Sequence, residues 1–428
     1  MGVLGTDRRV LALAMARMAD ALGNSFLIIV LPGYIASGEI DVTGLVGGRL
    51  LGAELTLPLL IGVVLSLFGL LNSLGQPFTG RISDRTGRRK AFVLTGLAVF
   101  GVASAAYPFV TAYEAVVVVR ALQGVGAAFT VPATVALVNE YSAVDTERGG
   151  NFGVFNTFRL AGFGFGPIIA GLVVDAGPYP TPAGALSGFD AAFGVAVLGA
   201  AVSFALVALF IRDPERTGGA AAEDIAFRVF DRDGDGLDPV FALGVGTFLM
   251  AIGIALFATL QGTINARLDQ GPFMFSVQFA AVVLANVLFQ VPVGRASDRF
   301  GRRRFIVGGF ALLVPALVVQ GYVTSSLAMV AARLVQGVAV AMVFAPSLAL
   351  AGDLAEGGAS GSKLSVLTMA FGLGIAVGPT AAGYLVRFGF AVPFLASAGL
   401  GVVAFALVYT QVHDTLDPAP GPAPAPRD

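Results

Sequence analysis

The sequence predicts an all-α polytopic membrane protein, with twelve transmembrane helices in two pseudo-symmetric six-helix bundles. Composition is the first observation: 56% of the residues are hydrophobic, 12% are charged and the mean hydropathy is +0.84, values outside the range of soluble domains. The second is the recurrence of apolar runs near twenty residues, the length at which a helix crosses about 30 Å of hydrocarbon. A β-barrel would show short alternating segments instead. The third is a charged motif that occurs twice, half a chain apart, which indicates a duplicated unit.

Six spans are predicted in each half of the chain from the apolar runs and the polar breaks between them. The first six cover residues 10–36, 56–79, 90–110, 113–140, 151–175 and 190–211. The second six cover residues 240–266, 272–293, 304–322, 326–351, 363–387 and 389–411. The segment before the first run is too short and polar for a cleaved signal, so we expect that run to remain as a span.

The distribution of Lys and Arg predicts a protein of the cell (cytoplasmic) membrane with both termini cytoplasmic. In this orientation the inside segments carry nineteen of the 26 cations, and the outside loops carry only Arg49, Arg267 and Arg387. The predicted parts are an N-terminal bundle (1–211), a cytoplasmic central loop (212–239), a C-terminal bundle (240–411) and a disordered Pro-rich tail (412–428).

Composition also excludes several classes of function. Without cysteine the chain has no thiol nucleophile or thiolate metal site, and its one histidine, His413, lies beyond the last span. Lys90 is followed by Ala and Lys363 by Leu, so neither completes a nucleotide-binding P-loop. The net charge of −1 is not that of a nucleic-acid binder. We therefore expect no enzyme activity, no resident cofactor and no nucleic-acid partner, and a monomer in the lipid bilayer.

Three motifs recur in the second half of the chain at nearly one offset. GRISDRTGRRK, from Gly80 to Lys90, returns as GRASDRFGRRR, from Gly294 to Arg304, with eight of eleven positions identical. The pattern R-x-x-Q-G at positions 120–124 returns at positions 333–337, and G-x-x-x-G-P-x-x-A-G at positions 162–171 returns at positions 374–383. Six spans duplicated in this way form a parallel repeat, related by an axis along the membrane normal.

These motifs resemble those of the major facilitator superfamily, and the resemblance covers residues 1 to about 411. The loop motif G-x-x-x-D-R-x-G-R-R/K is found at Gly80, Asp84, Arg85, Gly87 and Arg88, and its copy at Gly294, Asp298, Arg299, Gly301 and Arg302. The span-four motif begins at Arg120, Gln123 and Gly124. The span-five signature of the twelve-span drug:proton antiporters is matched at Gly153, Gly162, Gly166, Pro167 and Gly171. Ala170 stands there in place of the usual glycine.

The resemblance implies a role for each motif. The loop motif would act as a gate, because in this family it latches the cytoplasmic side in the outward-open state, with span eleven as the partner of the first copy. The simpler interpretation is positive-inside anchoring, which does not need Asp84. The span-five glycines and Pro167 would bend the helix and prevent uncoupled leak. Ordinary close packing of helices in lipid is the alternative for these glycines.

Ionisable residues inside the spans are the strongest functional signals, since an unpaired charge is costly in the bilayer. Asp20 is the only carboxylate predicted near the midplane, and Arg17 lies one turn earlier on the same helix face. We interpret Asp20 and Arg17, with Arg120 of the span-four motif, as the proton-coupling residues. A static ion pair between Arg17 and Asp20, without a role in transport, is the alternative. Arg159 would bind an anionic group or Asp20.

Five polar residues and one aromatic residue of spans one, five and seven are candidates for a substrate cavity, because these spans face the centre in the family's fold. The candidates are Asn24, Asn156, Arg159, Phe257, Gln261 and Asn265. The alternative is that each bonds within its own bundle.

The central loop contains part of a calcium-binding pattern. Asp231, Asp233 and Asp235 match three ligand positions of an EF-hand, and Gly236 matches its turn glycine. Ala242 stands where the bidentate glutamate is expected. A solvated acidic linker is therefore the favoured interpretation, and calcium binding is the other.

The leading functional hypothesis is a secondary active transporter that exports small amphiphilic or drug-like molecules in exchange for protons. A proton-coupled symporter or a uniporter of a small metabolite is the first alternative. A non-transporting membrane sensor or scaffold is the second, but a scaffold does not need a repeated gate motif. The fold alone does not fix which of these is correct.

Overall fold

A computed structural model describes residues 8–50, 52–141, 145–182, 184–213, 229–230, 236–354 and 360–414. The first bundle contains α1 (Arg8–Ala36), α2 (Leu57–Thr86), α3 (Arg89–Ala106), α4 (Tyr113–Tyr141), α5 (Asp145–Ala176) and α6 (Gly188–Phe210). The second contains α7 (Pro239–Thr259), α8 (Gln261–Leu268), α9 (Pro272–Phe300), α10 (Arg302–Tyr322), α11 (Ser326–Asp353), α12 (Ser360–Leu385) and α13 (Val392–Gln411). Short 3-10 turns follow α3 (Tyr107–Phe109) and α12 (Val386–Phe388).

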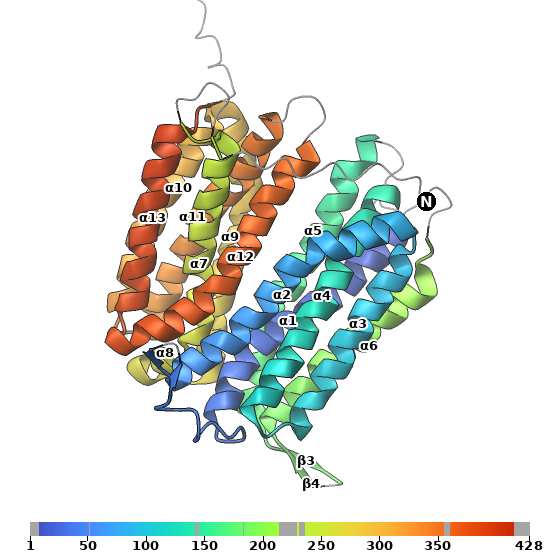
Figure 1. Cartoon of the computed structure of the whole chain (residues 1–428), viewed down its shortest axis with the longest axis vertical. Coiled ribbons are helices and arrows are strands. Elements are labelled where there is room, and N and C mark those ends of the chain that lie inside the picture. The colour runs from blue at the N-terminus through green and yellow to red at the C-terminus, as the bar shows by residue number, and fades with distance from the viewer. Residues whose placement is uncertain are drawn as a thin grey trace, which may run out of the picture.

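Two small antiparallel hairpins complete the described secondary structure. β1 (Arg49–Leu50) pairs with β2 (Ala53–Glu54), and β3 (Tyr179–Thr181) pairs with β4 (Gly184–Leu186). Figure 1 shows the β3–β4 hairpin at one end of the molecule. This end is called the hairpin end, and the opposite end, where α2 and α9 finish, is called the motif end.

The predicted fold class is confirmed, because twelve described helices are long and apolar enough to cross a membrane. Two details differ from the sequence prediction. The helices α2 and α9 each continue seven residues past the predicted ends at 79 and 293, since the first part of each charged motif is helical. The seventh predicted span is two helices, because the backbone turns at Leu260 and its N–H donates to the Phe257 carbonyl at 3.1 Å.

Local sequence signals explain several helix ends. The side chains of Thr56 and Ser187 accept hydrogen bonds from the backbone three residues on and so cap α2 and α6. Asp238 caps α7, with Pro239 at its first position. The Asp238-Pro239 pair therefore begins a transmembrane helix. At the other end of α2, Gly87 has a left-handed φ of 66°, which a residue with a side chain rarely adopts.

The two bundles have the same internal packing. In the first, α1 packs on α5 and α6, and α4 packs on α2 and α3. In the second, α7 packs on α12 and α13, and α11 packs on α9 and α10. Between the bundles, α2 packs on α12 and α5 packs on α9. These are equivalent contacts, since each joins a second-position helix of one bundle to a fifth-position helix of the other.

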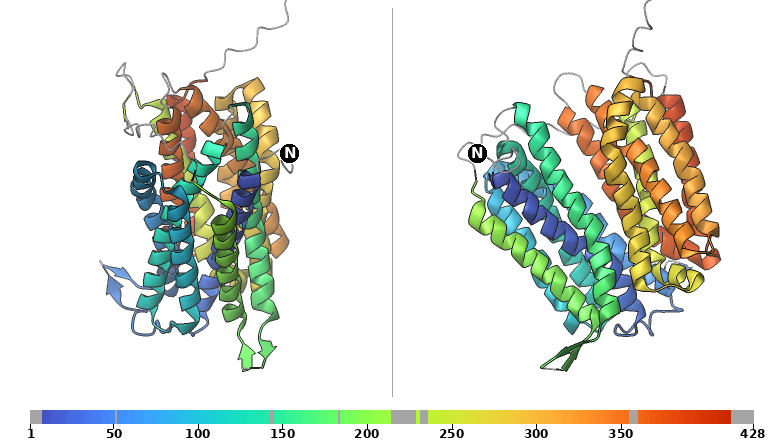
Figure 2. Two further views of the ribbon diagram at one scale, coloured as in Figure 1. Left: turned by 90° about the vertical axis from the view of Figure 1, so that its right-hand side faces the viewer. Right: turned by 180° about the vertical axis from the view of Figure 1, so that it is seen from behind.

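The hydrophobic core is shared at one end and divided at the other. One cluster contains residues of both bundles, including Phe26 and Phe193 of the first with Phe257 and Phe275 of the second. Two further clusters each belong to one bundle. The bundles lie close together at the hairpin end and diverge toward the motif end, as Figures 1 and 2 show.

Small residues allow the closest approach between the bundles at the hairpin end. A Cβ atom added at Gly62 would lie 2.4 Å from the Pro379 carbonyl oxygen, and one at Gly171 would lie 2.6 Å from the Ser276 hydroxyl. Close backbone approach through glycine is a common basis of helix packing in lipid. Toward the motif end α2 turns to its own bundle, where Thr79 donates to the Ala128 carbonyl.

Hydrogen bonds also cross between the bundles in this region. The Ser66 and Thr380 hydroxyl oxygens are 2.7 Å apart, joining α2 to α12. The Phe273 N–H donates to Asp175 at 3.1 Å, so a carboxylate at the end of α5 caps the first turn of α9. A cap of this kind is favourable because the free N–H groups and the helix dipole attract negative charge.

Crosslinking Ser66→Cys to Thr380→Cys is expected to arrest the transport that the sequence predicts, because the crosslink holds the hairpin end closed. The chain has no native cysteine to interfere. Oxidation should stop transport in proteoliposomes and a reductant should restore it, while each single variant remains active under the same oxidation. Full activity of the crosslinked protein would show that α2 and α12 do not separate during transport.

Candidate functional site

The first copy of the charged motif ties three helices of its own bundle together. Arg89, at the start of α3, contacts Asp84 of α2 at 3.3 Å and Glu140 of α4 at 2.7 Å. The Arg89 side chain is only 14% exposed, so these ion pairs are partly shielded from solvent. Asp213, just after α6, accepts a hydrogen bond from the Lys90 N–H at 2.8 Å and thereby caps α3. The motif thus joins α2, α3, α4 and the end of α6.

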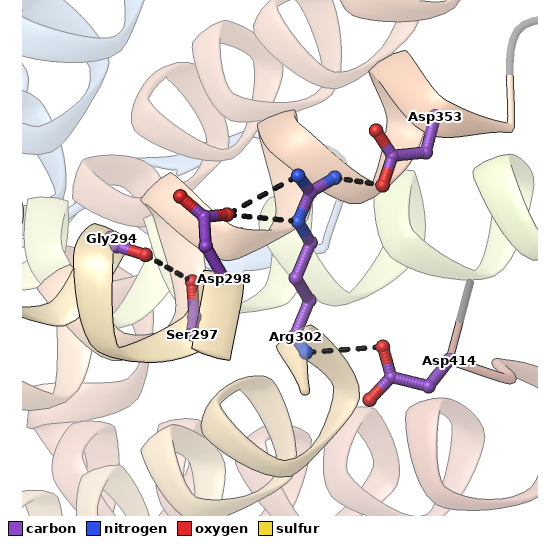
Figure 3. A network of polar contacts seen from close by, with 6 residues as sticks. All are labelled: Gly294, Ser297, Asp298, Arg302, Asp353 and Asp414. Atoms are coloured by element: carbon purple, nitrogen blue, oxygen red, sulfur yellow. Dashed lines mark hydrogen bonds and ion pairs between the residues drawn. The ribbon is translucent and has the colours of Figure 1, made fainter. Parts of the chain in front are cut away.

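The second copy builds an equivalent arrangement in the C-terminal bundle, shown in Figure 3. Arg302 contacts Asp298 at 3.2 Å, and it donates to Asp353 at the end of α11. Asp414, just after α13, accepts from the Arg302 N–H at 3.1 Å. The Ser297 hydroxyl donates to the Gly294 carbonyl within α9. We call each arrangement, Arg89 with Asp84 and Glu140, and Arg302 with Asp298 and Asp353, a charge clamp.

The two clamps differ in one detail. In the first copy the clamp arginine is Arg89, the residue after Arg88. In the second copy it is Arg302, which aligns with Arg88 and not with Arg89. Arg85 and Arg88 are exposed, and neither forms an ion pair with a described residue. Gly301 ends α9 with a φ of 98°, as Gly87 ends α2.

The gate that the sequence predicts stays a prediction, because residues 355–359 and the side chains at 360–365, where α12 begins, lie outside the described residues. Gly80 lies inside α2, not at a turn, and its Cα faces the Pro132 ring of α4. Every ion pair that Asp84 and Asp298 make with a described residue stays within the same bundle. None of these described ion pairs involves span eleven, which is α12 in the structure.

Four acidic partners of the clamps were not singled out by sequence reasoning. They are Glu140, Asp213, Asp353 and Asp414. The repeat contains a signal for two of them, because Glu140 and Asp353 are separated by the same offset that relates Arg120 to Arg333. Asp213 and Asp414 each follow the last span of a bundle by a few residues.

The span-four motif is a buried polar cluster inside the first bundle. Arg120 is 1% exposed, and it donates to the Gln123 side chain at 3.0 Å. Tyr107 donates to the same amide oxygen, and the Gln123 amide donates to Ser104 at 2.9 Å. The guanidinium of Arg120 lies 4.4 Å from the centre of the Phe68 ring. Cation–π contact with an aromatic face can partly replace solvation of a buried cation.

The copy of this motif has the same construction around Arg333, which is fully buried. Arg333 donates to Gln336 at 2.6 Å and to the Gln278 carbonyl at 3.3 Å. Its guanidinium lies 4.0 Å from the centre of the Phe257 ring. Neither Arg120 nor Arg333 forms an ion pair with a carboxylate in the part of the chain that the structure describes.

The glycines of the span-five signature have two different neighbours. A Cβ atom at Gly162 would lie 2.2 Å from the Met18 carbonyl, and one at Gly166 would lie 2.1 Å from the Ser25 hydroxyl, so both pack on α1. Gly171 packs on α9 of the other bundle. Gly153 has open space, and α5 continues through Pro167. The signature therefore holds α5 against α1 and also forms part of the contact between bundles.

The residues proposed for proton coupling are only partly brought together. Arg17 donates to Asp20, and the two side chains are 15% and 12% exposed. Arg159 of α5 lies close enough to Arg17 for their charges to repel. It donates to the Asn156 side chain at 2.9 and 3.1 Å. Arg120 instead belongs to the separate cluster with Gln123.

The other cavity candidates occupy different environments. Phe257 is fully buried, beneath Arg333 and stacked on Phe275 at 4.9 Å. Asn265 accepts from Gln270 at 3.1 Å. The side-chain oxygens of Asn24 and Gln261 are buried and have no hydrogen-bond partner among the described residues.

The calcium-binding pattern of the central loop is not tested. Its three candidate ligands, Asp231, Asp233 and Asp235, lie outside the described residues, so calcium binding stays a prediction.

Replacing Arg89 by Gln should lower the stability of the protein more than replacing Arg88. Loss of Arg89 leaves the part-buried Glu140 without its ion pair, which costs roughly 1–3 kcal/mol. Arg88 is exposed, so its replacement should be nearly neutral. Thermal unfolding in detergent tests this, and equal Tm values for the two variants would contradict the clamp.

Replacing Gly162 by Ala should destabilise the first bundle, whereas Gly164→Ala should be tolerated. The new Cβ atom would lie 2.2 Å from a backbone carbonyl of α1 in the first case and 3.6 Å from a Val283 methyl in the second. Overpacking of this kind typically costs about 1–3 kcal/mol. Thermal unfolding of the two variants side by side is the measurement. Similar Tm values would show that α1 and α5 are not tightly packed there.

Comparison with known proteins identifies relatives of the whole fold. The family model of the Major Facilitator Superfamily matches residues 5–234 and 243–427. An uncharacterized MFS-type transporter of Methanocaldococcus jannaschii is 25% identical over 176 residues, which is 41% of this chain and 46% of the relative. Multidrug resistance protein 2 of Bacillus subtilis is 24% identical over 277 residues, or 62% of this chain and 65% of the relative. These matches thus span about half to two thirds of the relatives' length.

A solved structure has the same architecture. The bacterial homolog of the human lysosomal transporter Spinster, in an inward-facing and occupied conformation, superposes with a TM-score of 0.74. The two chains are 14% identical, and the match covers 94% of this chain and 95% of the other, which establishes the fold alone. With its duplicated motifs, twelve apolar spans and this family match, the chain belongs to the Major Facilitator Superfamily.

Proposed function

We propose that the protein exports small amphiphilic molecules across the cytoplasmic membrane in exchange for protons, by alternating access. The observation that carries this proposal is the buried Asp20, held by Arg17 deep within the first bundle. A carboxylate in this setting can exchange a proton as its access to solvent changes. The name of the Bacillus relative, a multidrug resistance protein, supports an amphiphilic substrate.

The depth of Asp20 supports a role in coupling. It lies twelve residues into α1, which is about 18 Å from the helix start at a rise of about 1.5 Å per residue. Other described carboxylates lie in loops or near helix ends, as Glu114, Glu140, Asp175 and Asp353 do. Ionisable groups at membrane depth are costly, so they usually mark ion or substrate pathways.

The contacts of the two ends support alternating access. With the motif end taken as cytoplasmic, the arrangement is inward-facing, because the hairpin end is joined through Ser66 to Thr380 and Asp175 to Phe273. The outward-facing state requires these bonds to break and the motif ends to approach each other. The charge clamps lie wholly within each bundle, so each bundle can rotate without losing them.

A simple exchange cycle follows from the ion pair. When Asp20 is ionised it holds Arg17 and is available to a cationic or donor group of the substrate. Protonation of Asp20 removes the charge that attracts both Arg17 and such a group, so the substrate leaves where the proton enters. A carboxylate that meets each side in turn can couple the two movements in this way.

Transport of an anionic metabolite is the second candidate function. Arg159 has an amide partner, Asn156, and no carboxylate partner among the described residues. Together with Arg17 it outweighs the one negative charge of Asp20. An acidic substrate would complement this excess of positive charge.

Replacing Asp20 by Asn should abolish substrate-dependent proton release while leaving the protein folded. The test uses purified protein in proteoliposomes under an imposed pH gradient, with cationic, neutral and anionic amphiphiles as substrates. Glu39→Gln, which changes an exposed acid just beyond the other end of the same helix, is the matched control and should behave as wild type.

Three results would decide between the candidates. Proton release driven by cationic or neutral amphiphiles supports the exchange proposed here. Proton movement in the same direction as an anionic substrate favours the second candidate. Transport that needs no gradient, or full coupling in Asp20→Asn, would contradict the role of Asp20.

A further inference from the structure

A small cavity lies inside the first bundle beside Asp20, where four helices meet. Its volume is about 10 Å³. Ala16, Arg17 and Asp20 of α1 and Val93 of α3 line it, together with Thr130 and Thr134 of α4 and Ser203 and Val207 of α6. All of these residues except Arg17, whose side chain is 15% exposed, are buried, so most of the cavity wall belongs to the interior of the bundle.

The size of the cavity selects a small occupant. One water molecule needs a cavity of about 10–15 Å³ and two to four polar partners. The cavity meets both conditions, because four of the named residues carry oxygen atoms. A substrate molecule is far larger, so this is not part of the substrate site.

The polar groups around the cavity have donors and lone pairs with which a water molecule can form hydrogen bonds. The Thr130 hydroxyl donates to the Gly126 carbonyl, and the Thr134 hydroxyl donates to the Thr130 carbonyl. Each threonine therefore offers only lone pairs to the cavity. Ser203 is 1% exposed and lines the cavity, and its hydroxyl can both donate and accept a hydrogen bond there.

Asp20 also has unused bonding capacity on this side. Arg17 donates to its Oδ2 atom, and no described residue donates to its Oδ1 atom. A water molecule can donate to Oδ1 and to a threonine oxygen while it accepts from Ser203. One water can thus bond to Asp20, to one of the two threonines and to Ser203.

The cavity lies between Asp20 and the motif end. Val93 is in the second turn of α3, and Val207 is three residues before the end of α6. About one helical turn, roughly 5 Å, separates these valines from the ends of their helices. The side of Asp20 that faces the cavity therefore points into its own bundle, and α12 and α9 of the other bundle do not line it.

We propose that this cavity binds one water molecule, which gives Asp20 a proton route through the N-terminal bundle, separate from the substrate route between the bundles. The role as a route rests on the proton exchange proposed above, whereas the water site does not. On deprotonation, the Asp20 O–H bond breaks and the water oxygen takes the proton. The water passes one proton to solvent at the motif end, so the net change is the loss of one proton from Asp20.

The charges near Asp20 are compatible with a neutral occupant. Arg17 pairs with Asp20 from the same helix, and Arg159 approaches from α5. The cavity-lining residues of α3, α4 and α6 are uncharged. Two cations already accompany one carboxylate, so a bound metal cation would add to an excess of positive charge.

Hydroxyl-radical labelling by X-ray radiolysis detects a buried water, because radicals form at the water and modify the side chains beside it. Val93 and Val207 are each 1% exposed and should be labelled in the wild-type protein. Val64, which is 0% exposed and does not line the cavity, is the internal reference and should not be labelled. Wild-type labelling of Val93 no greater than that of Val64 would overturn the water site.

Two variants at Ser203 test whether labelling of Val93 depends on the space in the cavity or on the Ser203 hydroxyl. Ser203→Val fills the cavity with a methyl group, so labelling at Val93 should be lost. Ser203→Ala removes the hydroxyl but leaves the space, so labelling should remain. Ala16→Val fills the cavity from α1 and replaces Ser203→Val if that variant does not fold. Labelling that persists in the filled variants would contradict the assignment.

The same variants test the proton route. Ser203→Val should lose substrate-driven proton release while it still binds substrate, and Ser203→Ala should retain both. Wild-type proton release in Ser203→Val would overturn the route.

A second labelling experiment uses choline in place of Na⁺. A loss of labelling on adding Na⁺ would show that the cavity holds a cation and would contradict the water site. Absence of coupled transport in the wild type would instead contradict the proposed function.

Discussion

One arginine held between two carboxylates ties each bundle together at the motif end. Arg89 bridges Asp84 and Glu140, and Arg302 bridges Asp298 and Asp353. An acid beyond the last helix of each bundle caps the helix that carries the arginine. Because these bonds need nothing from the other bundle, each bundle would keep them during the rocking motion proposed above. A rocking transporter depends on this internal rigidity.

The remaining architecture follows from where the bundles share their interior. At the hairpin end, one apolar cluster contains Phe26 and Phe275 from opposite bundles, and glycines bring α2 close to α12. At the motif end, each bundle has its own cluster. The structure is therefore held closed at one end by contacts that can be broken. Asp175, which caps α9 from α5, is a polar part of this closure.

The repeat made most of the fold predictable, since equal offsets place the same motif in the same position of each bundle. It did not determine which arginine of a run meets the acids. Arg89 and Arg302 hold non-equivalent places because α10 begins one residue earlier in the motif than α3. Phe257 was expected in the cavity but lies against Arg333, because α7 is apolar on all sides and its sequence does not fix which face points inward. The break falls at Leu260 itself and not at Gly262, two residues later, so the sequence did not place it.

Distances between spin labels at the two ends would test most directly whether the rigid bundles rock. One pair, at Ile82 and Phe300, reports on the motif end, and another, at Phe109 and Phe388, reports on the hairpin end; all four side chains are exposed. Double electron–electron resonance should show the motif-end distance shortening and the hairpin-end distance lengthening together as pH or substrate is changed. A pair within one bundle should not change. If neither distance changes under any of the conditions, the account is contradicted. It is also contradicted if the distance within one bundle changes.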